Sequence, residues 1–125
     1  MLYDRRGLED VWNRANAVGG CMKVLWSSRA SISLQRTSAY IEAKFGYLAK
    51  QRFLLRIHLT SELMEDNPYM GSVEPLLSGD PRGFRSIVVG KINKLVYYVK
   101  GDVIRISDLW DTRREPKGQA KETAK

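Results

Sequence analysis

The segment from Phe84 to Ser107 alternates apolar and polar residues, which is the pattern of strands that bury one face. Three strands are predicted, at Phe84–Val89, Leu95–Val99 and Val103–Ser107. The connections Gly90–Lys94 and Lys100–Asp102 are so short that they require antiparallel hairpins. The C-terminal part of the chain therefore predicts a small antiparallel sheet with one apolar face.

Upstream of these strands, apolar residues recur at the three- and four-residue spacing of helices. The stripe of a first helix, which begins after a serine N-cap, consists of Ala30, Leu34, Thr37, Ile41 and Phe45. A second helix runs from about Leu48 to Glu65, and Pro68 ends it because proline disfavours helix in the residue before it. Since Gly46 separates the two helices, they are expected to fold back as a hairpin.

The order of elements predicts an α+β fold, β-α-α-β-β-β, in which the N-terminal strand Lys23–Trp26 precedes a helical hairpin packed on one face of the antiparallel sheet. We expect one domain over residues 22–116, since 125 residues suit a single core. Residues 1–21 are a leader, either a short amphipathic helix or translated upstream message with Met22 as the natural start. Residues 117–125 are polar and are expected to be a flexible tail.

The formal net charge of +7 favours a polyanionic partner such as RNA, DNA or an acidic protein segment, although a solubilising surface excess would give the same number. The single cysteine, Cys21, excludes a disulfide framework or a cysteine-based zinc site within the chain, and the single histidine, His58, excludes a multi-histidine site. We therefore expect no metal and no cofactor. No apolar run has membrane-spanning length, so a soluble, cytoplasmic protein with no membrane partner is expected.

Alternation along the predicted strands also sorts their side chains between two faces. If Leu95, Tyr97 and Val99 point into the core, the opposite face collects cations and one aromatic ring. These outer residues are Arg85, Lys94, Tyr98 and Arg105, with Lys91 in a neighbouring turn and Arg113 and Arg114 at the edge. Guanidinium groups bind phosphate bidentately and an aromatic ring can stack on a base, so the face suits RNA. The alternative is a solvated face whose long cations prevent edge pairing.

Several motifs of this chain occur in the same order as in a known group of proteins, which the chain therefore resembles. The predicted domain begins with MKVLWS, and its second helix ends with Met64-x-x-x-Pro68-x-x-Gly71. The sheet segment reads FRSIVV, then KLVYYV, then VIRISDLWDTRREP. Over about Met22 to Pro116, this combination resembles the RelE/ParE superfamily of toxins from bacterial type II toxin–antitoxin modules.

The resemblance implies a small growth-inhibiting toxin that a cognate antitoxin holds inactive in a toxin–antitoxin hetero-oligomer. RelE-like members cleave messenger RNA on the ribosome without a metal, whereas ParE-like members poison DNA gyrase. By position, Arg85, Lys94 and Arg113 match basic residues of the nuclease branch, and Tyr98 is a substitute for a tyrosine that is missing after Arg113. The implied catalytic residues are these four, and the residues expected to bind nucleic acid or the target are Arg105, Arg114 and Lys91.

Two positions depart from the nuclease pattern. Ile87 stands where that branch has a second basic residue, and Asp111 replaces a histidine that is common in relatives. In-line RNA cleavage then lacks an evident general acid or base. We expect a ribosome-dependent, metal-independent mRNA endoribonuclease. Two alternatives stay open, a ParE-like gyrase poison without nuclease activity and a non-toxic basic domain that binds RNA or protein.

Overall fold

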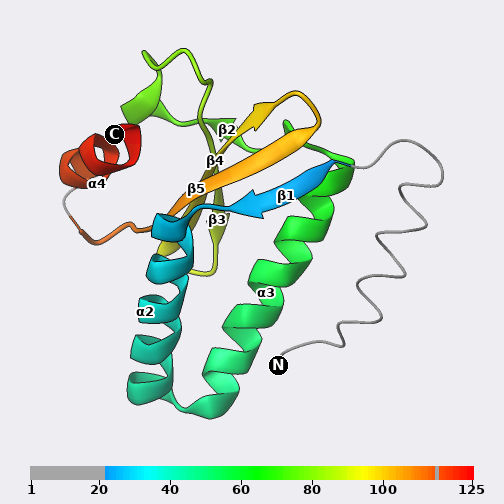
Figure 1. Ribbon diagram of the computed structural model, residues 1–125. Helices are drawn as coiled ribbons and strands as arrows, with labels where there is room; N and C mark the ends of the chain where they lie inside the picture. The colour runs from blue at the N-terminus through cyan, green and yellow to red at the C-terminus, as the bar shows by residue number, and fades with distance from the viewer. Residues whose placement is uncertain (1–21, 115) are drawn as a thin grey trace.

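The computed structural model describes residues 22–114 and 116–125, so the leader predicted over residues 1–21 lies outside the described residues. Its elements are β1 (Lys23–Trp26), α2 (Ser28–Phe45), α3 (Tyr47–Asp66), β2 (Ser72–Val73), a 3-10 turn (Pro75–Leu77), β3 (Arg85–Val89), β4 (Asn93–Lys100), β5 (Val103–Asp111) and α4 (Pro116–Ala124). Helices α2 and α3 run side by side as a hairpin, and α4 is not part of that hairpin (Figure 1). The α+β class and the order β-α-α-β-β-β are confirmed.

The five strands form one mixed sheet in the order β1-β5-β4-β3-β2. The predicted hairpins between β3 and β4 and between β4 and β5 are present, and both are antiparallel. Strand β1 instead lies parallel to β5, with Lys23 opposite Val103 and Trp26 opposite Ile106. The sheet is therefore mixed rather than wholly antiparallel, because the two C-terminal hairpins bring β5 beside β1 in the same direction.

The helical hairpin forms where the sequence predicts it. The hydroxyl of Ser27 accepts a hydrogen bond from the amide of Ala30 at 3.0 Å, which caps the start of α2. Gly46, with a φ of 96°, separates α2 from α3 in a backbone conformation that glycine adopts without strain. Both helices bury one stripe against the sheet, and the residues of this first core include Ala30, Phe53, Ile57, Met64, Leu95, Tyr97, Ile104 and Ile106.

The opposite face of the sheet is covered by α4 and the 3-10 turn. A second apolar core consists of Leu77, Phe84, Val96, Trp110 and Ala120. The indole Nε1 of Trp110 donates a hydrogen bond to Thr123 Oγ1 at 2.9 Å. The carboxamide of Gln119 accepts from the amide of Asp111 at 3.1 Å and donates to the carbonyl of the same residue at 2.9 Å. Helix α4 thus contributes both apolar and polar contacts to β5.

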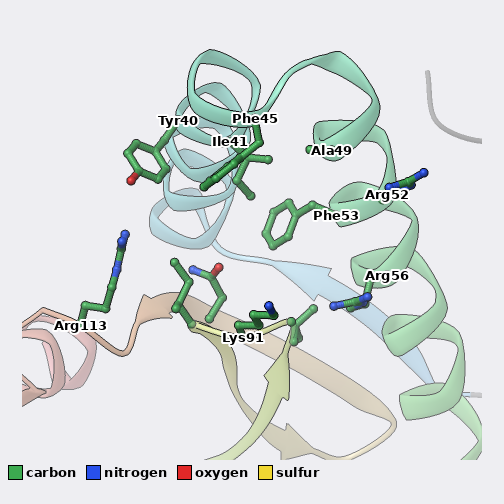
Figure 2. Close-up of a pocket in the computed structure, with 13 residues that line it drawn as sticks. Tyr40, Ile41, Phe45, Ala49, Arg52, Phe53, Arg56, Lys91 and Arg113 are labelled. Carbon is green, nitrogen blue, oxygen red and sulfur yellow. The ribbon is translucent and has the colours of Figure 1, made fainter.

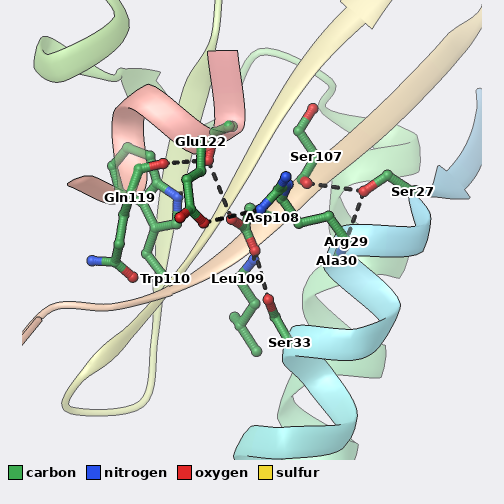
Figure 3. Close-up of polar contacts among 11 residues, drawn as sticks. Ser27, Arg29, Ala30, Ser33, Ser107, Asp108, Leu109, Trp110, Gln119 and Glu122 are labelled. Carbon is green, nitrogen blue, oxygen red and sulfur yellow. Dashed lines mark hydrogen bonds and ion pairs between the residues drawn. The ribbon is translucent and has the colours of Figure 1, made fainter. Parts of the chain in front are cut away.

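Polar side chains also join α4 and β5 to α2 (Figure 3). Arg29 Nη1 forms an ion pair with Glu122 Oε2 at 3.1 Å, and Ser33 Oγ donates to Asp108 Oδ1 at 2.7 Å. The flexible tail predicted over residues 117–125 is therefore corrected to a docked helix. The polar composition of this segment predicted a flexible tail. A helix can nevertheless dock when one of its faces carries no charge. The buried residues of that face are Gln119, Ala120 and Thr123.

A β-bulge decides which side chains of β5 reach the second core. The register between β4 and β5 shifts between Val96 and Tyr97, which leaves Ser107 as an extra residue in β5. Ile106, before the bulge, packs in the core beneath α2 and α3. Strict alternation would place Trp110 on the same side, but the extra residue turns it towards α4.

Within residues 22–114 and 116–125, no helix combines the length and the apolar character needed to cross a membrane. The same residues contain no group of three or more histidine, cysteine, aspartate or glutamate side chains arranged to hold a metal ion.

Candidate functional site

Arg85 lies on the face of the sheet that α2 and α3 cover, because it is opposite Tyr97 in the β3–β4 ladder. Its Nη1 donates to the carbonyl of Gly71 at 2.7 Å, and its guanidinium lies 5.1 Å from the centre of the Tyr69 ring. The prediction that Arg85 shares the outer face with Lys94 is wrong. Alternation alone could not assign the faces, since both faces of this sheet pack against apolar residues.

Lys94 lies on the outer face and forms an ion pair with a glutamate that no sequence motif singled out. Its ammonium contacts Oε1 of Glu74, a fully buried residue, and lies 5.3 Å from the centre of the Trp110 ring. Glu74 also accepts hydrogen bonds from the Leu76 amide at 3.0 Å and the Ser86 hydroxyl at 2.9 Å. Burial acts to raise the pKa of Glu74, but these hydrogen bonds and the one from Lys94 together lower it. The charge of Lys94 is therefore balanced inside the protein.

Tyr98 and Arg105 share this outer face, as predicted, because they are opposite each other in the β4–β5 ladder. The ring of half-buried Tyr98 meets Phe84 edge to face, with 5.3 Å between the ring centres. The guanidinium of Arg82 lies 4.8 Å from the centre of Phe84 and 6.0 Å from that of Tyr98. Tyr98 is thus packed beside a cation and a second ring, whereas Arg105 is exposed.

Arg113 and Arg114 follow β5. Arg113 donates two hydrogen bonds to Asp111, from Nε to Oδ1 at 3.1 Å and from Nη2 to Oδ2 at 3.0 Å, and its guanidinium lies 5.6 Å from the centre of the Tyr40 ring. The hydrogen bond from the Arg113 side chain is the main cause that holds the pKa of Asp111 below its usual range. Arg114 is exposed and lines, with Arg36, a polar cavity of about 500 Å³.

The four residues implied for catalysis do not converge on one site. Lys94 and Tyr98 share the outer face, Arg85 lies on the opposite face, and Arg113 lies beyond the end of β5. Because the sheet separates Arg85 from Lys94, a single scissile phosphate cannot contact both in this arrangement.

A groove lies between the hairpin of α2 and α3 and the turn that joins β3 to β4 (Figure 2). We call it the hairpin groove; its volume is about 430 Å³. Its apolar lining residues are Ile41, Phe45, Ala49, Phe53, Val89 and Ile92. Its cationic lining residues are Arg52, Arg56, Lys91 and Arg113. Among the described residues that line it there is no carboxylate, so the groove is apolar within and positively charged at its margins.

This combination suits a ligand that is both apolar and acidic, such as an amphipathic segment of an acidic protein. Lys91, which was expected to bind the target, and Arg113, which was implied as catalytic, both line the groove. No sequence pattern connects them with Arg52 and Arg56. Phe45, which helical spacing assigned to a buried stripe, is 68% exposed. Only the docking of the helical hairpin against the β3–β4 turn brings these residues together.

Comparison with known proteins gives consistent results. The family model described as the ParE toxin of the type II toxin–antitoxin system parDE matches residues 24–116. Among solved structures, the chromosomal ParDE toxin–antitoxin system from P. aeruginosa is similar to this chain, with a TM-score of 0.61 and 17% sequence identity. That similarity covers 74% of this chain and 98% of the other, and it supports the fold. No curated protein matches the chain.

Proposed function

This chain belongs to the ParE toxin family of type II toxin–antitoxin systems, and we propose that it arrests growth by poisoning DNA gyrase until its antitoxin neutralises it. The observation that carries the proposal is the match of the ParE family model to residues 24–116, which include both helices of the hairpin and, apart from Lys23, all five strands. ParE-like members of the superfamily poison gyrase and do not cleave RNA. The family match therefore favours gyrase as the target of this chain.

The positions of the candidate catalytic residues support the same choice. A ribonuclease needs charged and proton-transferring groups around one phosphate. In this chain Arg85 and Lys94 lie on opposite faces of the sheet, and Lys94 is paired with Glu74. A gyrase poison requires a binding surface and no catalytic group, so this separation does not count against it.

The proposal is tested by adding the purified chain to a gyrase supercoiling reaction. We expect less supercoiled product and the appearance of linear DNA from trapped gyrase–DNA cleavage complexes after protein digestion. Primer extension on translated messages, after induction in cells, is expected to show no new ends. Codon-phased 5′ ends without trapped complexes would instead establish an mRNA endoribonuclease. Inactivity in both assays, without growth arrest, would leave a non-toxic binding domain.

We further propose that the hairpin groove receives an acidic, amphipathic segment of the antitoxin. Lys91→Glu and Phe45→Ser are each expected to weaken antitoxin binding by at least about tenfold, since one removes a cation and the other an apolar contact. Isothermal titration with the cognate antitoxin measures the effect. Arg105→Glu, an exposed charge reversal on the outer face, is the matched control and should bind normally.

Growth assays distinguish an antitoxin site from a target site in the hairpin groove. Variants of Lys91 and Phe45 should stay toxic and should escape rescue by the co-expressed antitoxin. If they lose toxicity while antitoxin binding is unchanged, the groove contacts the target instead and this assignment is wrong.

A further inference from the structure

The face of α3 that points away from the first core carries four leucines. Their exposed fractions are 69% for Leu48, 44% for Leu55, 48% for Leu59 and 53% for Leu63. At 3.6 residues per turn these positions form one stripe, which lies opposite the buried stripe of Phe53, Ile57 and Met64. None of the four lines the hairpin groove. Helix α3 is thus apolar on two opposite faces, and the described residues cover only one of them.

The charges beside this leucine stripe change sign along α3. The residues beside the stripe are basic in its N-terminal part, Arg52 and Arg56, and acidic in its last turns, Glu62 and Asp66. This order opposes the helix dipole, which favours acidic residues near the N-terminus and basic residues near the C-terminus. The charge order therefore costs stability within one chain. It is complementary to a helix that runs in the opposite direction and has the same order of charges.

We propose that the leucine stripe is the interface of a homodimer in which α3 packs antiparallel against α3 of a second copy. A two-fold symmetric contact requires a patch that is complementary to itself. Charges that reverse sign about a central apolar residue meet this requirement, because the rotation places the basic half of one helix beside the acidic half of the other. A different partner would not require such self-complementarity.

Leu59 lies near the middle of the stripe and defines the register of the dimer. Residues four positions away on either side, Leu55 and Leu63, then face each other across the two-fold axis. Arg52 and Asp66 lie seven positions from Leu59 on either side, and a spacing of seven keeps them on the same side of the helix. Arg52 of each copy then forms an ion pair with Asp66 of the other copy. Neither Arg52 nor Asp66 forms an ion pair with another residue of the described part of the chain.

The first test is the mass of the full chain, purified free of antitoxin, by size-exclusion chromatography with light scattering at micromolar concentration. We expect twice the chain mass of 14.3 kDa. Leu59→Lys should give the mass of one chain, because it places two ammonium groups together at the axis. Leu25→Lys is the matched control, since Leu25 on β1 is 47% exposed, and should remain dimeric. A monomeric parent chain, or a dimer that survives Leu59→Lys, overturns the proposal.

Charge reversal tests the register. Arg52→Asp and Asp66→Arg should each raise the dimer dissociation constant at least about tenfold, because each places like charges opposite one another. The double variant should restore the parent constant. Both reversals suit the helix dipole better than the native residues do, so a loss of dimer cannot be ascribed to a weaker α3.

A helix of the antitoxin on the leucine stripe gives different results. In that case Leu59→Lys would weaken antitoxin binding and the double charge reversal would restore nothing, and either result overturns the homodimer. Because neither assay measures growth arrest or gyrase activity, the outcome is independent of the proposed target.

Discussion

Lys94→Met is expected to lower the free energy of unfolding by about 3–5 kcal/mol, because breaking a buried ion pair leaves one charge without a partner. The carboxylate of Glu74 is fully buried, and Lys94 is the cation that contacts it. The effect should lie near the lower figure, since 22% of the Lys94 side chain is exposed to solvent. Urea denaturation followed by circular dichroism measures it. A loss of toxicity in this variant would then reflect unfolding and would not identify a catalytic lysine.

Two further variants isolate the ion pair. Glu74→Gln combined with Lys94→Met should recover most of the lost stability, because glutamine can still accept hydrogen bonds from the Leu76 amide and the Ser86 hydroxyl. Lys100→Met removes an exposed cation from the same strand and should change stability by less than about 0.5 kcal/mol. Equal losses in Lys94→Met and Lys100→Met would contradict the role of the pair.

The ion pair of Glu74 and Lys94 also determines how the stability of the protein changes as the pH falls. The folded chain holds the pKa of Glu74 below its ordinary value, so the folded state binds this proton less tightly than the unfolded state does. The stabilisation is fully present above the ordinary glutamate pKa and is lost as pH falls through the folded pKa. The double variant lacks this component, and its stability should therefore change less between neutral and acidic pH.

Trp110→Ala is expected to cost about 3–5 kcal/mol of unfolding free energy, as large-to-small substitutions of buried aromatic residues do. Trp110 is 1% exposed and packs in the second core with Phe84, Val96 and Ala120. The substitution also removes the donor to Thr123 Oγ1, so α4 loses one of its hydrogen bonds to β5 together with the apolar contact. Denaturation measures the energy, and faster trypsin cleavage after Lys117 or Lys121 reports the release of α4.

Two controls separate packing from hydrogen bonding in this core. Thr123→Val removes the acceptor of the indole bond but keeps the volume, and it should cost about 1–3 kcal/mol. Leu76→Ala alters a partly exposed neighbour in the 3-10 turn and should have a small effect. If Trp110→Ala changes neither stability nor the rate of cleavage, α4 does not contribute to the fold.

Most elements of the fold could be predicted because their signals are local. The two long helices follow from apolar spacing and from residues that start or end a helix, which are Ser27, Gly46 and Pro68. The two C-terminal hairpins follow from their short connections. Helix α4 could not be predicted in this way, because its polar sequence has no long apolar stripe. Its position depends on Trp110, which the bulge at Ser107 turns towards it.

The candidate site was less predictable than the fold. Alternation placed Lys94, Tyr98 and Arg105 on one face correctly, but it placed Arg85 with them because it assumed a single apolar face. It also treated Lys94 as a surface cation, since the buried carboxylate that balances it comes from a loop 20 residues away. The hairpin groove could not be predicted from the sequence, because its lining residues come from two helices, a turn and the segment after β5.

The order of residues along this chain determined by itself the helical hairpin, the strand hairpins and the net positive charge, because periodicity and composition act over a few neighbouring positions. The tertiary structure alone decided which face each cation occupies, which carboxylate balances Lys94 and whether the last residues dock. Those outcomes depend on contacts between distant segments, as between Glu74 and Lys94 or Trp110 and Thr123. The energy of burying a group is set by the residues that pack around it, and those residues are not its neighbours in sequence.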